Sequence, residues 1–134
     1  MKLELSSFEK ALASLIEALA EFDRTQSQFV KDACIQRFEY TYELAHKLLK
    51  RQLEAMSPNP SEIDQMSFPD MIRSGAERGL LAQSWDQWKY FRDARNATSH
   101  AYNEKKANEV FVQIPAFRDE AAFLLARLQE RNAE

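Results

Sequence analysis

With 134 residues, the chain is long enough for one domain and too short for two domains with separate cores. Hydrophobic residues make up 45% and charged residues 29%, a balance that excludes an intrinsically disordered chain. The formal net charge of −3 argues against broad electrostatic wrapping of nucleic acid. We therefore expect a single globular domain over residues 1–134.

Residues that form turns are scarce, which points to long regular elements. Two glycines and four prolines are too few for a β-sandwich or barrel, which needs a turn signal about every ten residues. No apolar run approaches the roughly 20 residues of a membrane span, and the first residues lack the apolar stretch of a signal peptide. The single cysteine, Cys34, cannot form an internal disulfide. We expect an all-α cytoplasmic protein that makes no contact with membranes.

Two amphipathic helices are predicted in the first part of the chain. Apolar residues recur at helical spacing over residues 3–23 and again over residues 27–56. Only a short polar break separates the two stretches, so they should form an antiparallel hairpin. Cys34 falls within the apolar pattern of the second helix, and we expect it in the core.

A break at residues 57–61 follows, because each of its two prolines disfavours helix at the residue before it. A third, short helix is predicted to start after Ser67 and to end near Gly79, a residue suited to the left-handed position after a helix. Ser84 and Gln87 have the spacing of a capping box, S-x-x-Q, which would open a fourth helix.

A fifth helical region is predicted after Asn103. Pro115 lies inside it and lacks the amide hydrogen that a helix interior requires. We therefore expect the proline to divide this region into two helices, residues 104–113 and 115–131. Together these elements predict an up-and-down antiparallel helical bundle.

Residues 92–104 combine arginine, asparagine, histidine and tyrosine with little hydrophobic content. At about 100° per residue, Asn96 and His100 lie one turn apart on the same helix face. Arg95 and His100 are five residues apart, which places them about 140° apart on an undistorted helix. Both can serve one site only if the helix bends or ends nearby, or if they meet across a dimer.

The chemistry of these side chains suits RNA cleavage in which the ribose 2′-hydroxyl attacks its own phosphate. Arg95 offers a planar, permanently charged fork for the phosphate, and His100 can exchange a proton near neutral pH. The reaction needs a base, an acid and a cation, but no metal. One chain supplies one such histidine, whereas a symmetric dimer supplies two. A helix cap or an ordinary surface histidine is the simpler explanation of His100.

Other candidate sites are weaker. His46 lies in mid-helix with no evident partner, so a structural role is the default. The histidines and the cysteine lack the spacing of zinc ligands, and two glycines cannot build a phosphate-binding glycine-rich loop. We expect no metal and no cofactor. The aromatic residues Trp85, Trp88 and Phe91 are expected in the core or at a dimer contact.

The polar segment resembles a motif of HEPN domains. Residues 95–100, RNATSH, fit R-x4-H, and Tyr102 extends the match to R-x4-H-x-Y, the pattern of HepT-type HEPN toxins. Residues 35–47, IQRFEYTYELAHK, look like a helix of the subgroup called nucleotidyltransferase substrate-binding proteins. The pair Trp85 and Trp88 matches an aromatic helix of that subgroup. The resemblance covers nearly the whole chain.

This resemblance implies a helical bundle that forms a homodimer, or a larger even-numbered oligomer, and pairs with a minimal nucleotidyltransferase. In HepT-type pairs the HEPN protein is a metal-independent ribonuclease toxin, and the nucleotidyltransferase is the antitoxin that adds AMP to the motif tyrosine. Carried over to this sequence, Arg95 and His100 would be catalytic, Asn96 would support them, and Tyr102 would accept AMP.

Two other functions stay open. The chain could be a non-catalytic subunit that binds substrate for a two-component nucleotidyltransferase, as the name of the subgroup implies. It could also be a helical interaction module in which the motif only holds a dimer together. Cleavage of RNA by the isolated chain would separate the first hypothesis from both alternatives.

Overall fold

The computed structural model describes residues 2–133, and every regular element in this range is helical. The elements in chain order are α1 (Ser6–Thr25), α2 (Gln28–Met56), α3 (Pro60–Asp64), α4 (Phe68–Glu77), α5 (Trp85–Ala97), the 3₁₀ turn η1 (Thr98–His100) and α6 (Glu104–Arg131). The expected all-α class is confirmed. The predicted α1–α2 hairpin is also present, with helix ends within a few residues of the expected ones.

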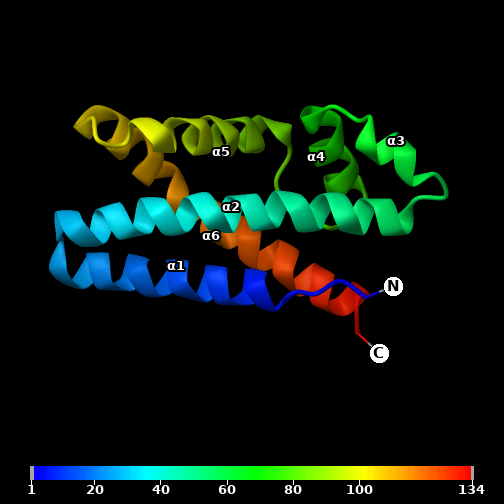
Figure 1. Ribbon diagram of the computed structural model, residues 1–134, viewed down its shortest axis with the longest axis horizontal. Helices are drawn as coiled ribbons and strands as arrows, with labels where there is room; N and C mark the ends of the chain where they lie inside the picture. The colour runs from blue at the N-terminus through cyan, green and yellow to red at the C-terminus, as the bar shows by residue number, and fades with distance from the viewer. Residues whose placement is uncertain (1, 134) are drawn as a thin grey trace.

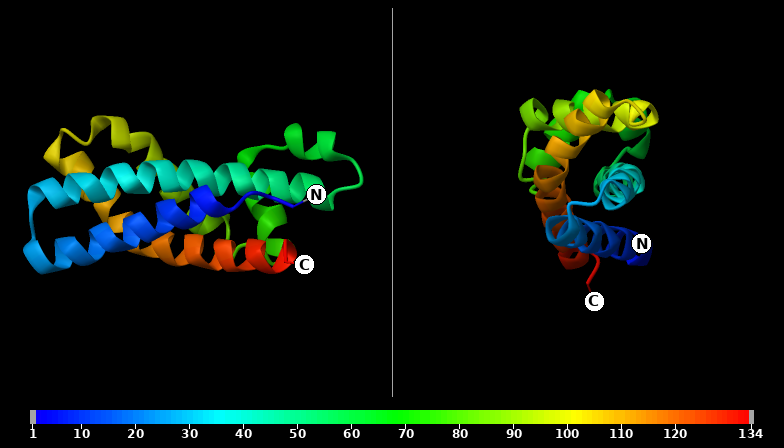
Figure 2. Two further views of the ribbon diagram at one scale, coloured as in Figure 1. Left: turned by 60° about the horizontal axis from the view of Figure 1, so that its bottom comes forward. Right: turned by 90° about the vertical axis from the view of Figure 1, so that its left-hand side faces the viewer.

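The four long helices α1, α2, α5 and α6 alternate in direction, so the bundle is up-and-down as predicted (Figure 1). Both ends of the chain lie at the same end of the bundle, where the backbone amide of Leu3 donates to Oδ1 of Asn132 at 3.0 Å. Helices α1 and α6 pack side by side, and α3 and α4 lie beside the C-terminal half of α2 (Figure 2). Helix α5 packs mainly on α6 and also contacts α2.

Aromatic side chains fill the centre of the bundle. Phe38, Trp88, Phe91 and Phe117 are fully buried, and the Phe117 ring lies 5.1 Å from Phe38 and 5.5 Å from Phe91 between centroids. Burying one such side chain contributes about 1.5–3 kcal/mol to folding. Trp88 and Phe91 therefore belong to the core, whereas the half-buried Trp85 packs at its edge.

Cys34 is fully buried on α2, as the apolar pattern predicted. Ser67 caps α4 by accepting from the amide of Asp70, and Gly79 has a φ of 76° just after that helix, so both predicted ends are confirmed. The short helix α3 was not predicted. It begins at Pro60, one of the two prolines that marked the break, because a proline is well tolerated in the first turn of a helix.

The predicted division at Pro115 is wrong, since α6 runs through it without interruption. Proline in a helix interior costs about 3 kcal/mol, because one hydrogen bond is lost and the ring crowds the preceding turn. The neighbouring side chains of Ile114 and Phe117 are fully buried in the core. Their packing offsets the local cost and holds the helix together on both sides of the proline.

The capping box at Ser84 is also not formed. Ser84 precedes α5, but its side chain makes no capping hydrogen bond. Its backbone carbonyl instead accepts from the amide of Gln87 at 3.1 Å. The Gln87 side-chain amide donates to Oε1 of Gln113 on α6 at 3.4 Å. The helix starts where predicted, but contacts with α6 replace the local capping interaction.

One buried carboxylate ties α6 to the start of α5. Glu120 is 2% exposed and accepts three hydrogen bonds, from the amides of Ala82 and Gln83 at 2.9 Å each and from Nε1 of Trp88 at 2.8 Å. Buried charges are stable in proteins when they are fully hydrogen-bonded, as here. Glu120 therefore fixes the loop before α5, and with it the position of α5 over α2.

Replacing Glu120 with alanine should lower the free energy of unfolding by about 3–5 kcal/mol, because three donors lose their acceptor at once. Chemical denaturation measures this change. The neighbouring Asp119→Ala is the matched control, since Asp119 is exposed and should change stability by no more than about 0.5 kcal/mol. Equal unfolding midpoints for the two variants would contradict the role of Glu120.

Candidate functional site

The polar segment lies where α5 ends and the chain turns into α6. The α-helix stops at Ala97 and continues as one 3₁₀ turn, Thr98–His100. The Thr98 hydroxyl donates to the carbonyl of Arg95 at 2.8 Å, the local bond by which threonine weakens a regular helix. Asn103 then caps α6 by accepting from the amide of Lys106. The α-helix thus ends between Arg95 and His100, one of the conditions under which both could serve a single site.

Arg95 is half-buried and faces α2. Its Nε donates to Oε1 of Glu43 at 2.5 Å, so an ion pair joins the two helices. Burial of part of the side chain and this ion pair give the guanidinium a defined position. Asn96, the next residue, is exposed, but it lines the same cavity as Arg95.

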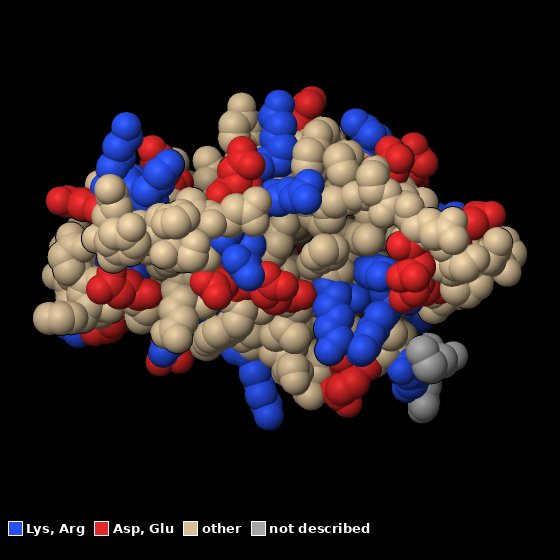
Figure 3. Space-filling model, turned by 45° about the horizontal axis from the view of Figure 1, so that its top comes forward, with Lys and Arg blue, Asp and Glu red and all other residues tan. Residues whose placement is uncertain are grey.

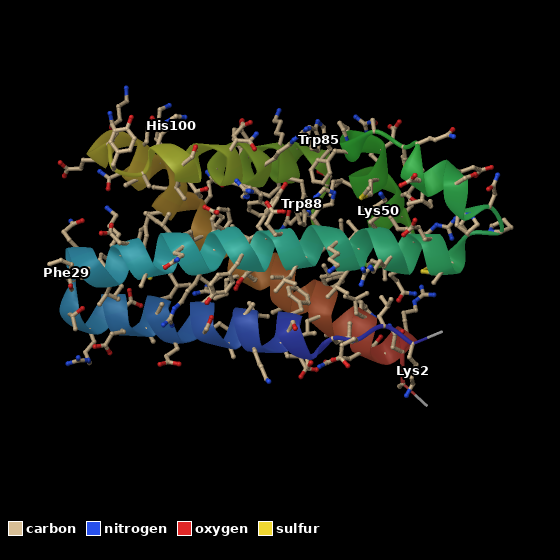
Figure 4. The ribbon with its side chains drawn as sticks, in the orientation of Figure 1. Lys2, Phe29, Lys50, Trp85, Trp88 and His100 are labelled. Carbon is tan, nitrogen blue, oxygen red and sulfur yellow. The ribbon has the colours of Figure 1, made fainter. Side chains whose placement is uncertain are left out.

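His100 and Tyr102 lie further along the turn, away from that cavity. Figure 4 shows His100 at the opposite end of α5 from Trp85, on the outside of the bundle. The His100 and Tyr102 rings are 6.4 Å apart between centroids, and Tyr102 is 88% exposed. Within one chain, the fold therefore brings Arg95 together with Asn96 and His100 together with Tyr102, but it does not bring all four into one cavity.

The cavity beside Arg95, called here the α2–α5 cavity, has a volume of about 400 Å³. Helix α2 contributes Tyr42, Glu43, His46 and Lys50, and α5 contributes Arg92, Arg95 and Asn96. The rest of its wall comes from α3, α4 and the residues between them, including Phe68. Acidic and basic side chains alternate over this side of the molecule, with neither sign dominant (Figure 3).

Sequence reasoning assigned His46 a structural role, and the structure makes it part of the cavity. Its ring packs edge-to-face on Phe68, with centroids 4.7 Å apart. Burial is the largest influence on its pKa and lowers it, while the nearby Glu43 partly opposes the shift. The spacing of Tyr42, His46 and Lys50 along α2 places all three on one helix face, a signal that the sequence did contain.

Among residues 2–133, no group of three or more histidine, cysteine, aspartate or glutamate side chains is arranged to hold a metal ion. Across the same range, the helices are either too short or too polar to cross a membrane. Two ion pairs lie in the α2–α5 cavity, Arg95 with Glu43 and Lys50 with Asp64 at 2.7 Å.

An up-and-down helical bundle with R-x4-H-x-Y at the end of its third long helix defines a HEPN-type protein of the HepT group. Residues 3–130 match the family model of nucleotidyltransferase substrate-binding-like proteins. The chain belongs to this family. The resemblance seen in residues 35–47 and 95–102 is therefore confirmed.

A related protein and a solved structure, both from Haemophilus influenzae, support the assignment. The chain is 37% identical to the probable ribonuclease HepT, in a match that covers 98% of this chain and 95% of that protein. It is also similar to a solved structure, that of the substrate-binding domain of a nucleotidyltransferase. That match has a TM-score of 0.87 and 32% identity, and it covers 94% of this chain and 99% of the other.

Proposed function

We propose that this protein is the toxin of a toxin–antitoxin pair, a metal-independent endoribonuclease that its cognate nucleotidyltransferase inhibits by AMP transfer. The observation that carries the proposal is the R-x4-H-x-Y segment, with His100 and Tyr102 exposed at the end of α5, in a chain 37% identical to a probable ribonuclease. Arg95 and His100 are the catalytic residues of the proposal, and Asn96 supports them.

In this reaction a histidine removes the proton of the ribose 2′-hydroxyl, whose oxygen then attacks the adjacent phosphorus. The bond from phosphorus to the 5′-oxygen breaks, and that oxygen takes up a proton. The products are a 2′,3′-cyclic phosphate and a 5′-hydroxyl. Arg95 stabilises the negative charge that builds up on the phosphate oxygens, and His100 transfers the protons.

A second copy of the chain completes the site. Arg95 and His100 of one chain do not share a cavity, and the mechanism needs both a base and an acid. A two-fold axis beside the end of α5 would bring two copies of the segment together and supply two histidines. Large apolar side chains are exposed near this end as well. Phe29, at the start of α2, is 88% exposed (Figure 4), and Val112, which lies near Glu104 and Lys105 on α6, is 71% exposed.

Sedimentation of the purified protein at micromolar concentration should therefore give a dimer or a larger even-numbered oligomer. Burial of the exposed apolar side chains provides the driving force, because soluble monomers rarely expose large apolar patches. A single monomeric species over this concentration range would contradict the two-fold site.

Tyr102 is the proposed acceptor of AMP. Its phenol oxygen would attack the α-phosphorus of ATP, lose its proton and displace pyrophosphate. The added phosphate would bring negative charge to the site where the RNA phosphate must bind, so inhibition follows without refolding.

The alternative is a non-catalytic subunit that binds substrate for the nucleotidyltransferase. The description of the family and the polar α2–α5 cavity favour it. The deciding experiment is to incubate the purified chain with single-stranded RNA in excess EDTA. The nuclease hypothesis expects cleavage. Intact RNA, together with tight binding of the nucleotidyltransferase, would favour the subunit.

A further inference from the structure

The α2–α5 cavity contains polar side chains whose hydrogen-bonding groups have no protein partner. Tyr42 is only 4% exposed, yet its hydroxyl makes no hydrogen bond with any residue in the range 2–133. In the same part of the chain, the His46 ring and the Asn96 side-chain amide make none either. No solvent-excluded side-chain nitrogen or oxygen among residues 2–133 lacks a partner, so these unpaired groups are open to the cavity that they line. A ligand in the cavity can therefore form hydrogen bonds with them.

Aromatic rings form one wall of the cavity. His46 packs edge-to-face on Phe68 at 4.7 Å and on Tyr42 at 6.4 Å, measured between ring centroids. The guanidinium of Arg92 lies over the Phe68 ring at 5.1 Å. Proteins that recognise single-stranded RNA stack unpaired bases on such rings and on arginine guanidinium planes.

Positive charge lies beside this wall. Arg92 makes its cation–π contact with Phe68 but no ion pair with residues 2–133. Arg95 uses Nε to bind Glu43, which leaves its two terminal nitrogens without a hydrogen-bond partner among the same residues. Such a fork is suited to bidentate contact with a phosphate. Aromatic rings next to guanidinium groups that keep unused donors are features of nucleotide-binding sites.

We propose that the α2–α5 cavity binds one unstacked nucleotide of the RNA substrate, with its base against Tyr42, His46 and Phe68 and its phosphate on Arg92 and Arg95. The volume of about 400 Å³ falls in the range of small-molecule sites and accommodates one nucleotide. The proposal rests on the nuclease function for the source of its ligand. The proposal places the bound nucleotide next to the phosphate that is cut. Arg95 would contact the phosphate of the bound nucleotide and also stabilise the charge at the cleaved phosphate.

Three groups can read the edge of the base. The Tyr42 hydroxyl and the Asn96 amide each donate and accept hydrogen bonds. Burial lowers the pKa of His46, so its ring is neutral at pH 7 and presents one donor and one acceptor. A site that hydrogen-bonds a base edge in this way discriminates among bases, so cleavage should prefer one base at the position held in the cavity.

The test measures binding of labelled single-stranded RNA by fluorescence anisotropy, with two cavity variants that keep most of the side-chain volume. Tyr42→Phe removes only the hydroxyl, and Arg92→Met removes only the charged fork. Each should raise the Kd for RNA by about five- to tenfold, equivalent to about 1–1.4 kcal/mol. Lys89→Met is the matched control, because Lys89 is an exposed cation on α5 outside the cavity. It should change the Kd by less than about twofold.

Binding does not depend on cleavage, so the two hypotheses fail differently. If wild type does not cut RNA but both cavity variants bind it more weakly than Lys89→Met does, the nuclease function is wrong and the nucleotide site stands. If wild type cuts RNA and all three variants bind it alike, the nucleotide site is wrong. The four nucleoside 5′-monophosphates are titrated in parallel. Loss of their binding in the variants, with RNA binding unchanged, would identify a free nucleotide as the ligand and overturn the RNA assignment.

Discussion

Replacing His100 with alanine, or Arg95 with alanine, is expected to lower the rate of RNA cleavage by at least about 100-fold. The imidazole transfers protons, and the guanidinium stabilises charge in the transition state. Because the two groups act on the same step, the double variant should be little worse than either single one. The rate is measured with a short fluorescent RNA under single-turnover conditions.

Lys105→Ala is the control for these variants, because Lys105 is an exposed cation close to the turn that carries His100. It should cleave RNA at nearly the wild-type rate. His100 is exposed as well, so His100→Ala should unfold within about 0.5 kcal/mol of wild type, and a loss of activity cannot be explained by unfolding. Cleavage at the wild-type rate by His100→Ala would instead favour the substrate-binding subunit.

Tyr102→Phe is expected to abolish AMP transfer completely, because the phenol oxygen forms the new bond to phosphorus. The variant should still cleave RNA, since the hydroxyl has no part in the proposed reaction. Each protein is incubated with the cognate nucleotidyltransferase, ATP and magnesium, and its intact mass is then measured. Wild type should gain the mass of one AMP group for each chain, and Tyr102→Phe should gain none.

Tyr90→Phe provides the matched control for this experiment. Tyr90 is 50% exposed on α5 but lies outside the motif, so its variant should be modified as fully as wild type. An AMP-sized increment on Tyr102→Phe equal to that of wild type would show that another residue accepts the group.

The helices were predictable from local patterns because their apolar residues follow the helical period. The apolar spacing over residues 3–23 and 27–56 predicted the hairpin. Gly79 predicted the end of α4, because glycine readily adopts the left-handed backbone found there. The prediction at Pro115 was wrong because the free-energy cost of proline is local, whereas the packing that offsets this cost comes from other helices. The role of Glu120 was not predictable for the same reason, since its three donors lie more than 30 residues away in the chain.

The candidate site was predictable only in part. Residues 92–104 stood out because their side chains have chemistry that a hydrophobic core does not need. The pairing of Arg95 with Glu43, and the position of His46 next to Phe68, arise only when α5 and α4 pack against α2. No sequence period links residues 43 and 95, so the α2–α5 cavity could not be found without the tertiary structure.

The most direct measurement is the chemical identity of the RNA ends that the purified wild-type protein produces in excess EDTA. Attack by the 2′-hydroxyl with proton transfer by His100 predicts 2′,3′-cyclic phosphate and 5′-hydroxyl ends. It also predicts that these ends form at an undiminished rate without metal and are absent with His100→Ala. Products with 3′-hydroxyl and 5′-phosphate ends, formed only when a divalent metal is present, would contradict the proposed mechanism.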